Sequence, residues 1–184
     1  MGTIKTTNIQ SISGSGTVTL GTSGETFAVG SGVTTTINRP AFKATLSGNQ
    51  SIANSSFTKV TLDTENFDTD NAFASNKFTV PTGQAGKYVF HYGGYMSSLG
   101  DDKRLILNLY KNGSEITGPK SQHQIYSTGG SSNVLQKTSF VIDLAVSDYI
   151  ELYVWQNQGG AVDLYADNTY LAGYKLGAYW QTEL

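Results

Sequence analysis

The chain has 184 residues, of which 38% are hydrophobic and 14% are charged, and its formal net charge is −2. This length fits one large all-β domain, or one ordinary domain with a small extra segment. The longest basic run is the pair Lys103-Arg104, which argues against nucleic-acid binding. There is no cysteine, so disulfides and thiolate metal sites are excluded.

The rest of the composition favours strands and turns. Thr and the 11 Tyr residues are typical of strands, while Asn and the 21 Gly residues are typical of turns. The apolar content predicts a modest core, so we expect the chain to bury more surface against copies of itself. The missing cysteines favour folding in a reducing cytosol. The start MGTIKTTNIQ lacks the apolar region of a signal peptide, and no run is long enough to span a membrane as a helix.

Residues 1–37 differ from the rest because they are rich in Gly, Ser and Thr. Short alternating pieces recur there, each set off by glycine: Thr17–Leu20, Thr26–Val29 and Val33–Ile37. Such pieces can bury their apolar positions only when stacked or wound with other chains. The segment is either a β-repeat stalk or a flexible linker, and its regular apolar pairs favour the stalk. Pro40 marks the boundary with a second domain over residues 38–184.

Alternation of apolar and polar residues predicts many short strands in that second domain. They cover residues 41–46, 57–62, 76–80, 87–92, 105–110, 134–144, 149–156, 161–165 and 170–180. Asn112-Gly113 predicts a hairpin turn, Gly93-Gly94 a strand break, and residues 63–71 a turn-rich stretch. No helical period is present, so about ten short strands predict an all-β sandwich or jelly roll.

Motifs in this domain resemble, in order, those of the C1q domain in the C1q/tumour-necrosis-factor superfamily. The matching segments are Pro40–Phe42, Phe57–Val60, Phe67-Asp68, Asn76–Pro81, Gly86–Phe90, Leu109–Gly113, Leu144–Ile150 and Asn168–Leu176. They resemble the family's "AF", "F-x-K-V", "YD", "GKFTCP", "GVYYF", "L-x-K-N-G", "L-x-x-GD-x-V" and closing "S-T-F-S-G-F-L-L". The resemblance covers about four fifths of the chain. It implies a ten-strand jelly roll that forms tight trimers and acts as a binding head without catalysis.

Several positions depart from the family's pattern. Asn76 and Ser147 replace glycines, and Val80 replaces a cysteine. A β-repeat segment stands where the animal members usually have a secretion signal and a collagen stalk. This arrangement is similar to virion proteins of tailed bacteriophages, in which a short stalk holds a trimeric C1q-like tip. The phage assignment is an analogy of architecture.

The sequence offers no catalytic, cofactor-binding or metal-binding site that we would assign. The histidines are His91, which we expect on the face opposite Tyr88, Phe90 and Tyr92, and His123 in a polar loop. Neither belongs to a known catalytic motif. The acids of residues 63–71 and the pair Asp101-Asp102 could bind calcium, or they could be solvated turn residues.

Aromatic residues are the main signal in the predicted strands. They are Tyr88, Phe90, Tyr92, Tyr110, Tyr149, Tyr153, Trp155, Tyr174, Tyr179 and Trp180. We expect most of them in the core and some along the axis of a trimer. Recognition is expected in loops 47–56, 93–104 and 118–133, since loops on a rigid β-scaffold usually carry binding. Trp155-Gln156-Asn157 is a candidate for sugar binding.

The sequence supports three functional hypotheses. The first is a non-enzymatic, homotrimeric structural protein of a phage virion, either a tail-associated adhesin or a capsid-bound short fibre. It would be made in the host cytoplasm, contact other virion proteins through residues 1–37 and face a host-surface glycan or protein with its head. The second is a soluble C1q-like recognition module, a lectin or ligand outside any virion. The third is a polysaccharide-cleaving fibre enzyme, which would need a carboxylate pair that the sequence does not reveal.

Overall fold

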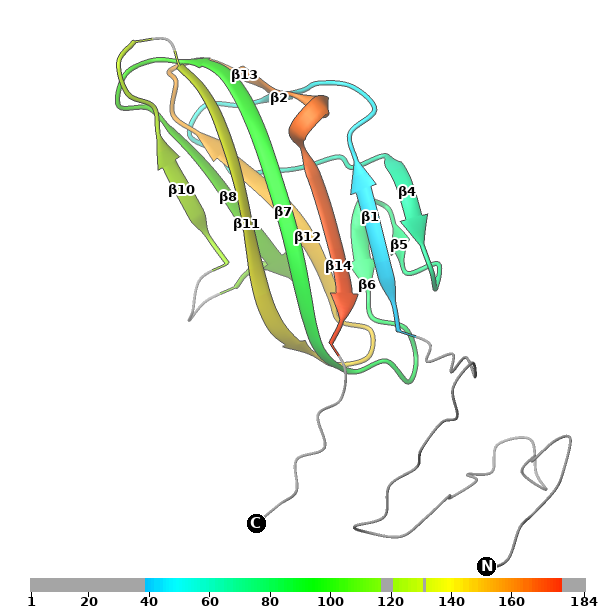
Figure 1. Ribbon diagram of the computed structural model, residues 1–184. Coiled ribbons are helices and arrows are strands. Elements are labelled where there is room, and N and C mark those ends of the chain that lie inside the picture. The colour runs from blue at the N-terminus through cyan, green and yellow to red at the C-terminus, as the bar shows by residue number, and fades with distance from the viewer. Residues whose placement is uncertain (1–38, 117–120, 131, 177–184) are drawn as a thin grey trace, which may run out of the picture. The chain divides into compact units, whose positions relative to one another are not determined.

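The computed structural model describes residues 39–116, 121–130 and 132–176 (Figure 1). The side chains of His123 and Ser132 also lie outside this description. The predicted stalk over residues 1–37 is outside it as well and stays a prediction. Among the described residues, no helix is long and apolar enough to cross a membrane.

The described residues form strands β1 to β14 and a short 3-10 helix, η1. Their bounds are β1 (Ala41–Thr45), β2 (Gln50–Ile52), β3 (Thr58–Lys59), β4 (Thr64–Asp68), β5 (Phe73–Ala74), β6 (Lys77–Thr79), β7 (Gly86–Leu99), β8 (Arg104–Lys111), β9 (Ser114–Glu115), β10 (His123–Tyr126), β11 (Ser132–Leu144), β12 (Tyr149–Gln156), β13 (Val162–Leu164), η1 (Ala166–Asn168) and β14 (Tyr170–Lys175).

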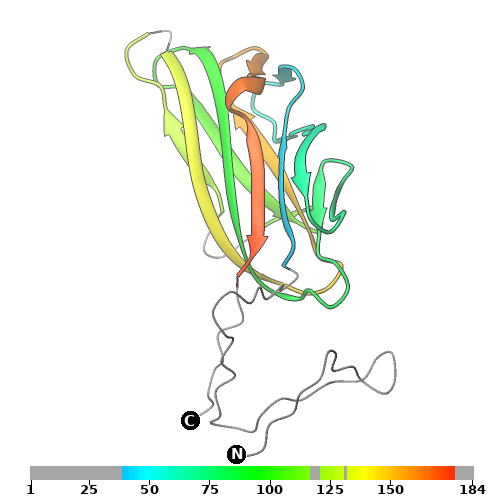
Figure 2. The same ribbon diagram turned by 45° about the vertical axis from the view of Figure 1, so that its right-hand side comes forward.

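The strands form two antiparallel sheets that face one another as a sandwich (Figures 1 and 2). Sheet A has the order β2-β13-β7-β14-β1-β4, and β11 also pairs with β7. Sheet B has the order β10-β8-β12-β6-β5, with β3 paired to β12 and β9 paired to β8. The prediction of an all-β sandwich is therefore confirmed.

The core between the sheets is built from stacked aromatic rings. Phe42 of sheet A stacks on Phe78 of sheet B with 4.8 Å between ring centroids and 8° between ring planes. Phe90 packs edge-on against Phe78 at 5.8 Å. A Cβ at Gly173 would lie 2.7 Å from the Phe90 ring and 3.0 Å from Phe42, so only glycine lets β14 approach these rings. As expected, Tyr88, Phe90 and Tyr92 are buried, while His91 points out of the core.

The predicted strand break at Gly93-Gly94 is wrong. β7 runs through both glycines to Leu99, so most of the predicted loop 93–104 is strand. A Cβ would lie 2.7 Å from the Tyr170 ring at Gly93 and 2.9 Å from Leu107 Cδ2 at Gly94. These glycines therefore make room for neighbouring side chains instead of ending the strand.

Other boundary predictions also need correction. The stretch over residues 63–71 contains β4, and the predicted loops 47–56 and 118–133 contain β2 and β10. These strands are short and lie toward sheet edges, where few apolar residues mark them. The predicted strand 57–62 shrinks to β3, although Val60 and Leu62 are buried.

The backbone explains several turn residues. The hairpin prediction at Asn112-Gly113 is confirmed, because both residues have positive φ (52° and 76°) between the paired strands β8 and β9. Asn76 and Ser147, which replace glycines of the family pattern, also have positive φ (60° and 70°). A left-handed backbone is strained for a residue with a Cβ, so both positions still carry the geometry that favours glycine.

We predict that Ser147→Gly raises the free energy of unfolding by about 0.5–1 kcal/mol. Relief of left-handed strain outweighs the larger entropy of the unfolded glycine chain. Urea denaturation followed by circular dichroism measures the change. Ser114→Gly is the matched control, because exposed Ser114 lies in strand β9 and should lose stability instead. Equal destabilisation by both substitutions would contradict the prediction.

Candidate functional site

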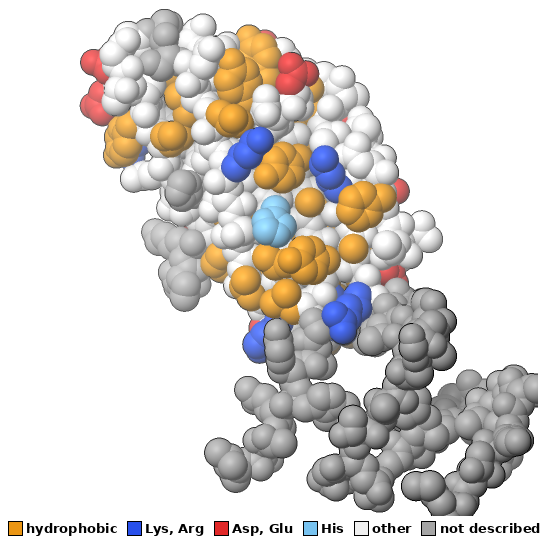
Figure 3. All heavy atoms as spheres, viewed as in Figure 1, with side chains coloured by type: hydrophobic (Ala, Val, Ile, Leu, Met, Phe, Trp, Pro, Cys, Tyr) orange, Lys and Arg blue, Asp and Glu red, His pale blue; other side chains and the backbone are white. Residues whose placement is uncertain are grey.

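The outward face of sheet A is one candidate surface (Figure 3). The pairing registers place Val141, Val89 and Tyr174 in one row across β11, β7 and β14, with His91 and Ala172 in the next row. Val141 is 55% exposed and Tyr174 is 45% exposed. Figure 3 shows hydrophobic side chains gathered on this face around a histidine, drawn in pale blue, with Lys or Arg side chains among them. We call these five residues the sheet A face.

His91 is part of this apolar face. Its ring stacks against Tyr174 with 6.1 Å between centroids. Its strand neighbours in the sheet are Ser139 on β11 and Ala172 on β14. No carboxylate belongs to this row, which Lys43 continues on β1. The arrangement offers a packing surface for another protein.

Strand β11 adds a second feature beside that face. It is 13 residues long and pairs with β7 along one side, whereas the described residues provide no strand for its other side. Leu135 on this strand is 44% exposed. A long edge strand with exposed apolar side chains is usually covered by another chain or segment.

The outer face of sheet B carries the second cluster of aromatic residues. Tyr149, Tyr153 and Trp155 alternate along β12, and Tyr110 on β8 stacks on Tyr153 with 3.9 Å between centroids and 24° between planes. Phe57 tilts against Tyr110 at 6.1 Å. All five rings are half-buried, and we call them the aromatic belt.

The belt corrects the expectation that most strand aromatics are core. Among the ten residues expected to follow that rule, only Tyr88, Phe90 and Tyr92 are buried in the described part of the chain. Four lie in the belt and Tyr174 lies on the sheet A face. Tyr179 and Trp180 lie outside the described residues.

Charged groups lie beside the belt and within it, since Glu151 shares the outer face of β12 with Tyr149 and Tyr153 and lies between them. Lys59 Nζ lies 2.6 Å from Glu151 Oε1, and Lys77 Nζ lies 4.2 Å from the centre of the Tyr149 ring. At one end of the belt, the Arg104 guanidinium lies 5.1 Å from the Trp155 ring and 5.6 Å from the Tyr126 ring. Burial raises the pKa of Tyr110 and Tyr153. Tyrosine is protonated at neutral pH even without this shift, so both hydroxyls can donate hydrogen bonds.

In the predicted sugar-binding motif Trp155-Gln156-Asn157, two of the three side chains make hydrogen bonds inside the protein. Gln156 is fully buried, and its side-chain amide donates to the carbonyls of Ile52 and Gly160 at 3.0 and 2.8 Å. The side-chain Oδ1 of Asn157 accepts a hydrogen bond from the Arg104 backbone N–H at 2.7 Å. Gln156 and Asn157 would have to break these hydrogen bonds to contact a sugar, whereas Trp155 makes none of them.

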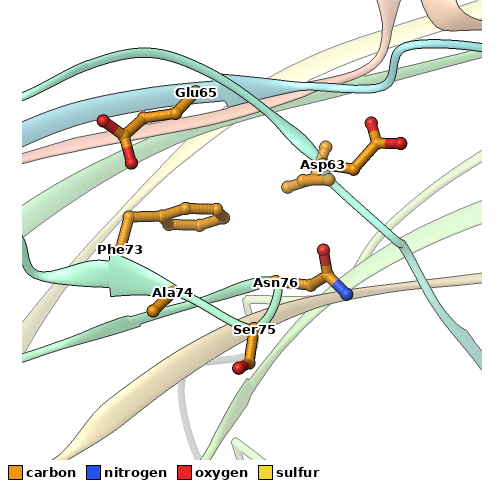
Figure 4. Close-up of a pocket in the computed structure, with 7 residues that line it drawn as sticks. Asp63, Glu65, Phe73, Ala74, Ser75 and Asn76 are labelled. Atoms are coloured by element: carbon orange, nitrogen blue, oxygen red, sulfur yellow. The ribbon is translucent and has the colours of Figure 1, made fainter.

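A small pocket lies beside the acidic stretch over residues 63–71 (Figure 4). Its volume is about 170 Å³, and it is lined by Leu62, Asp63, Glu65, Phe73, Ala74, Ser75 and Asn76. Figure 4 shows the carboxylates of Asp63 and Glu65 at opposite ends, with the Phe73 ring between them. The two carboxylates therefore do not converge on one point.

The acids predicted to be possible calcium ligands hold turns together. Asp63 accepts hydrogen bonds from the Ser47 hydroxyl at 2.6 Å and the Ser47 backbone N–H at 2.7 Å, and these bonds lower its pKa. Asp68 accepts from the backbone N–H of Phe73 at 2.7 Å and Asp70 at 3.1 Å. Within the described ranges, no group of three or more His, Cys, Asp or Glu side chains could hold a metal ion.

Asp101 and Asp102, the second acidic pair, also belong to a turn. The Asp101 carboxylate accepts the backbone N–H of Gly129 at 2.9 Å, which joins the β7–β8 and β10–β11 connections. Asp102 adopts a positive φ of 56° in the same turn.

Comparison with known proteins identifies the fold. No protein-family model matches the chain, and no curated protein matches it in sequence. The globular domain of zebrafish complement 1qA protein is similar in structure, with a TM-score of 0.53 and 19% identity over 76% of this chain and 99% of that one. Murine APRIL at pH 5.0 gives 0.54 and 12% over 76% and 100%, and Eiger TNF from S. frugiperda gives 0.53 and 12% over 79% and 96%. The fold is therefore a C1q/TNF-like jelly roll.

We predict that Asp68→Ala lowers the free energy of unfolding by about 1–3 kcal/mol, because two backbone N–H groups lose a charged acceptor. The loss should be the same in excess calcium and in EDTA, as measured by thermal unfolding. Asp143→Ala, which removes an exposed partner of Lys87, is the control and should change little. Stabilisation of the native chain by calcium that disappears in Asp68→Ala would show a metal site instead.

Proposed function

We propose that residues 38–184 form the binding head of a non-enzymatic homotrimer that belongs to a bacteriophage particle. Residues 1–37 connect this head to other virion proteins, as a tail-associated adhesin or a capsid-bound short fibre would require. The protein is made in the host cytoplasm and is located in the virion. The observation that carries the assembly part is the exposed sheet A face beside the unpaired edge of β11.

These two surfaces suit a closed ring of copies. They differ from one another and lie on adjoining parts of the sandwich, so the edge of one copy can cover the sheet A face of the next. Such a head-to-tail contact closes into a ring when the rotation between copies is that of a cyclic group. The contact would bury Tyr174, Val141 and Leu135, which are exposed in a single chain. The resemblance to the C1q domain indicates three copies in that ring.

Other observations support a non-enzymatic virion role. Asp63 and Asp68 hold turns, and the carboxylates of Asp63 and Glu65 lie at opposite ends of the small pocket (Figure 4). Glycine-rich residues 1–37 contain recurring apolar pairs before a C1q-like head, and the chain has no cysteine. This combination fits a fibre protein assembled in bacterial cytosol.

A soluble recognition module is the second candidate. The solved structures similar to this chain include a complement domain and a TNF protein of animals, which favours it. Both candidates use the head for binding, and they differ in whether residues 1–37 attach to a particle.

We predict that the full chain elutes with three times its 19.7 kDa mass in size-exclusion chromatography with light scattering. Val141→Asp should convert it to a monomer at micromolar concentration, because the contact would bury an unpaired charge. Val146→Asp is the matched control, since Val146 is 41% exposed in the turn after β11. A native monomer, or a trimer that survives Val141→Asp, would refute the proposed contact.

Deletion of residues 1–37 tests the virion role. We predict that the truncated protein stays trimeric but is missing from purified phage particles, as measured by mass spectrometry of the particles. Full-length protein carrying Ser114→Gly should be incorporated normally and serves as the control. Normal incorporation of the truncated protein would show that the attachment lies elsewhere.

A further inference from the structure

The aromatic belt on sheet B has no role in the core and none in the proposed contact between copies. It lies on the side of the sandwich opposite the sheet A face, so a ring of copies would leave it open to solvent. We infer that the belt, together with Arg104 and Tyr126 at one end, binds an uncharged glycan chain of pyranose sugars. This inference rests on the proposed function of the head and names its ligand.

The belt has the shape of a platform for an extended chain. Tyr149, Tyr153 and Trp155 point to one face because successive residues of a strand alternate between faces. At a rise of roughly 3.3 Å per residue, the distance from Tyr149 to Trp155 is about 20 Å, which matches several linked sugars. Tyr110 and Phe57 widen the platform from neighbouring strands, and Tyr126, which is 47% exposed, extends it beyond Trp155.

The chemistry of the belt matches the two surfaces of a pyranose ring. The C–H groups on one side of the sugar carry partial positive charge and pack on the negative face of an aromatic ring. The hydroxyls around the sugar's rim need hydrogen-bond partners. The hydroxyls of Tyr110 and Tyr153 can donate to them, because tyrosine is protonated at neutral pH.

The charges around the belt favour an uncharged ligand. Lys59 is paired with Glu151 at 2.6 Å, and Lys111 with Asp148 at 2.7 Å. Lys77 lies against the Tyr149 ring, and Arg104 lies between the rings of Trp155 and Tyr126. A polyanion such as single-stranded nucleic acid would instead need a groove of unpaired basic residues.

The test is calorimetric titration of the full-length protein with linear hexasaccharides of glucose, mannose, galactose and N-acetylglucosamine. We expect at least one to bind with a Kd below about 1 mM and with little change between low and high salt. Trp155→Ala should abolish the binding. Tyr126→Ala, which changes an exposed side chain and leaves the fold intact, should weaken it by about three- to tenfold.

Phe67→Ala is the matched control, because Phe67 is 49% exposed and lies on sheet A. Its affinity should equal that of the native chain. The inference is overturned if no hexasaccharide binds at millimolar concentration, if Phe67→Ala and Tyr126→Ala weaken binding equally, or if binding disappears at high salt. Light scattering on the same samples separates the two proposals: a trimer that binds no glycan contradicts this inference alone, and a monomer that binds one contradicts only the assembly.

Discussion

The stacking of Phe42 on Phe78 is the contact on which the rest of the structure depends. One ring comes from each sheet, at 4.8 Å and nearly parallel, and Phe90 closes the group from the side. Rings packed this closely leave no room for a Cβ on β14, which explains Gly173. These rings link the two sheets, and each strand presents one side to this core and the other to the outside of the sandwich.

Because the core takes only one side of each strand, the aromatic residues on the other side lie on the outer faces of the sandwich. Only 38% of the chain is hydrophobic, yet rings remain on both outer faces of the sandwich. On sheet A they accompany aliphatic side chains and an unpaired strand edge, which suits a dry contact with another copy. On sheet B they accompany ion pairs and tyrosine hydroxyls, which suits a hydrated ligand. In our proposals, the sheet A face therefore serves assembly and the aromatic belt on sheet B serves recognition.

Much of the fold could be predicted from the sequence, whereas the candidate surfaces largely could not. Strands β1, β8, β11 and β12 follow from alternation, and the Asn112-Gly113 hairpin follows from its turn chemistry. The continuation of β7 through Gly93-Gly94 depends on the side chains of Tyr170 and Leu107, which are distant in sequence. Alternation shows which residues share a face but does not show which face is inside. For that reason Tyr110 and Tyr153 could not be distinguished from the buried Tyr88 and Tyr92.

A crystal structure of the assembled full-length protein tests the central claim most directly, because it shows what covers the sheet A face. The account predicts a threefold axis, with Tyr174 and His91 of one copy buried against β11 of the next and the aromatic belt open to solvent. A structure in which the sheet A face is exposed, or in which the belt forms the contact between copies, would contradict the account.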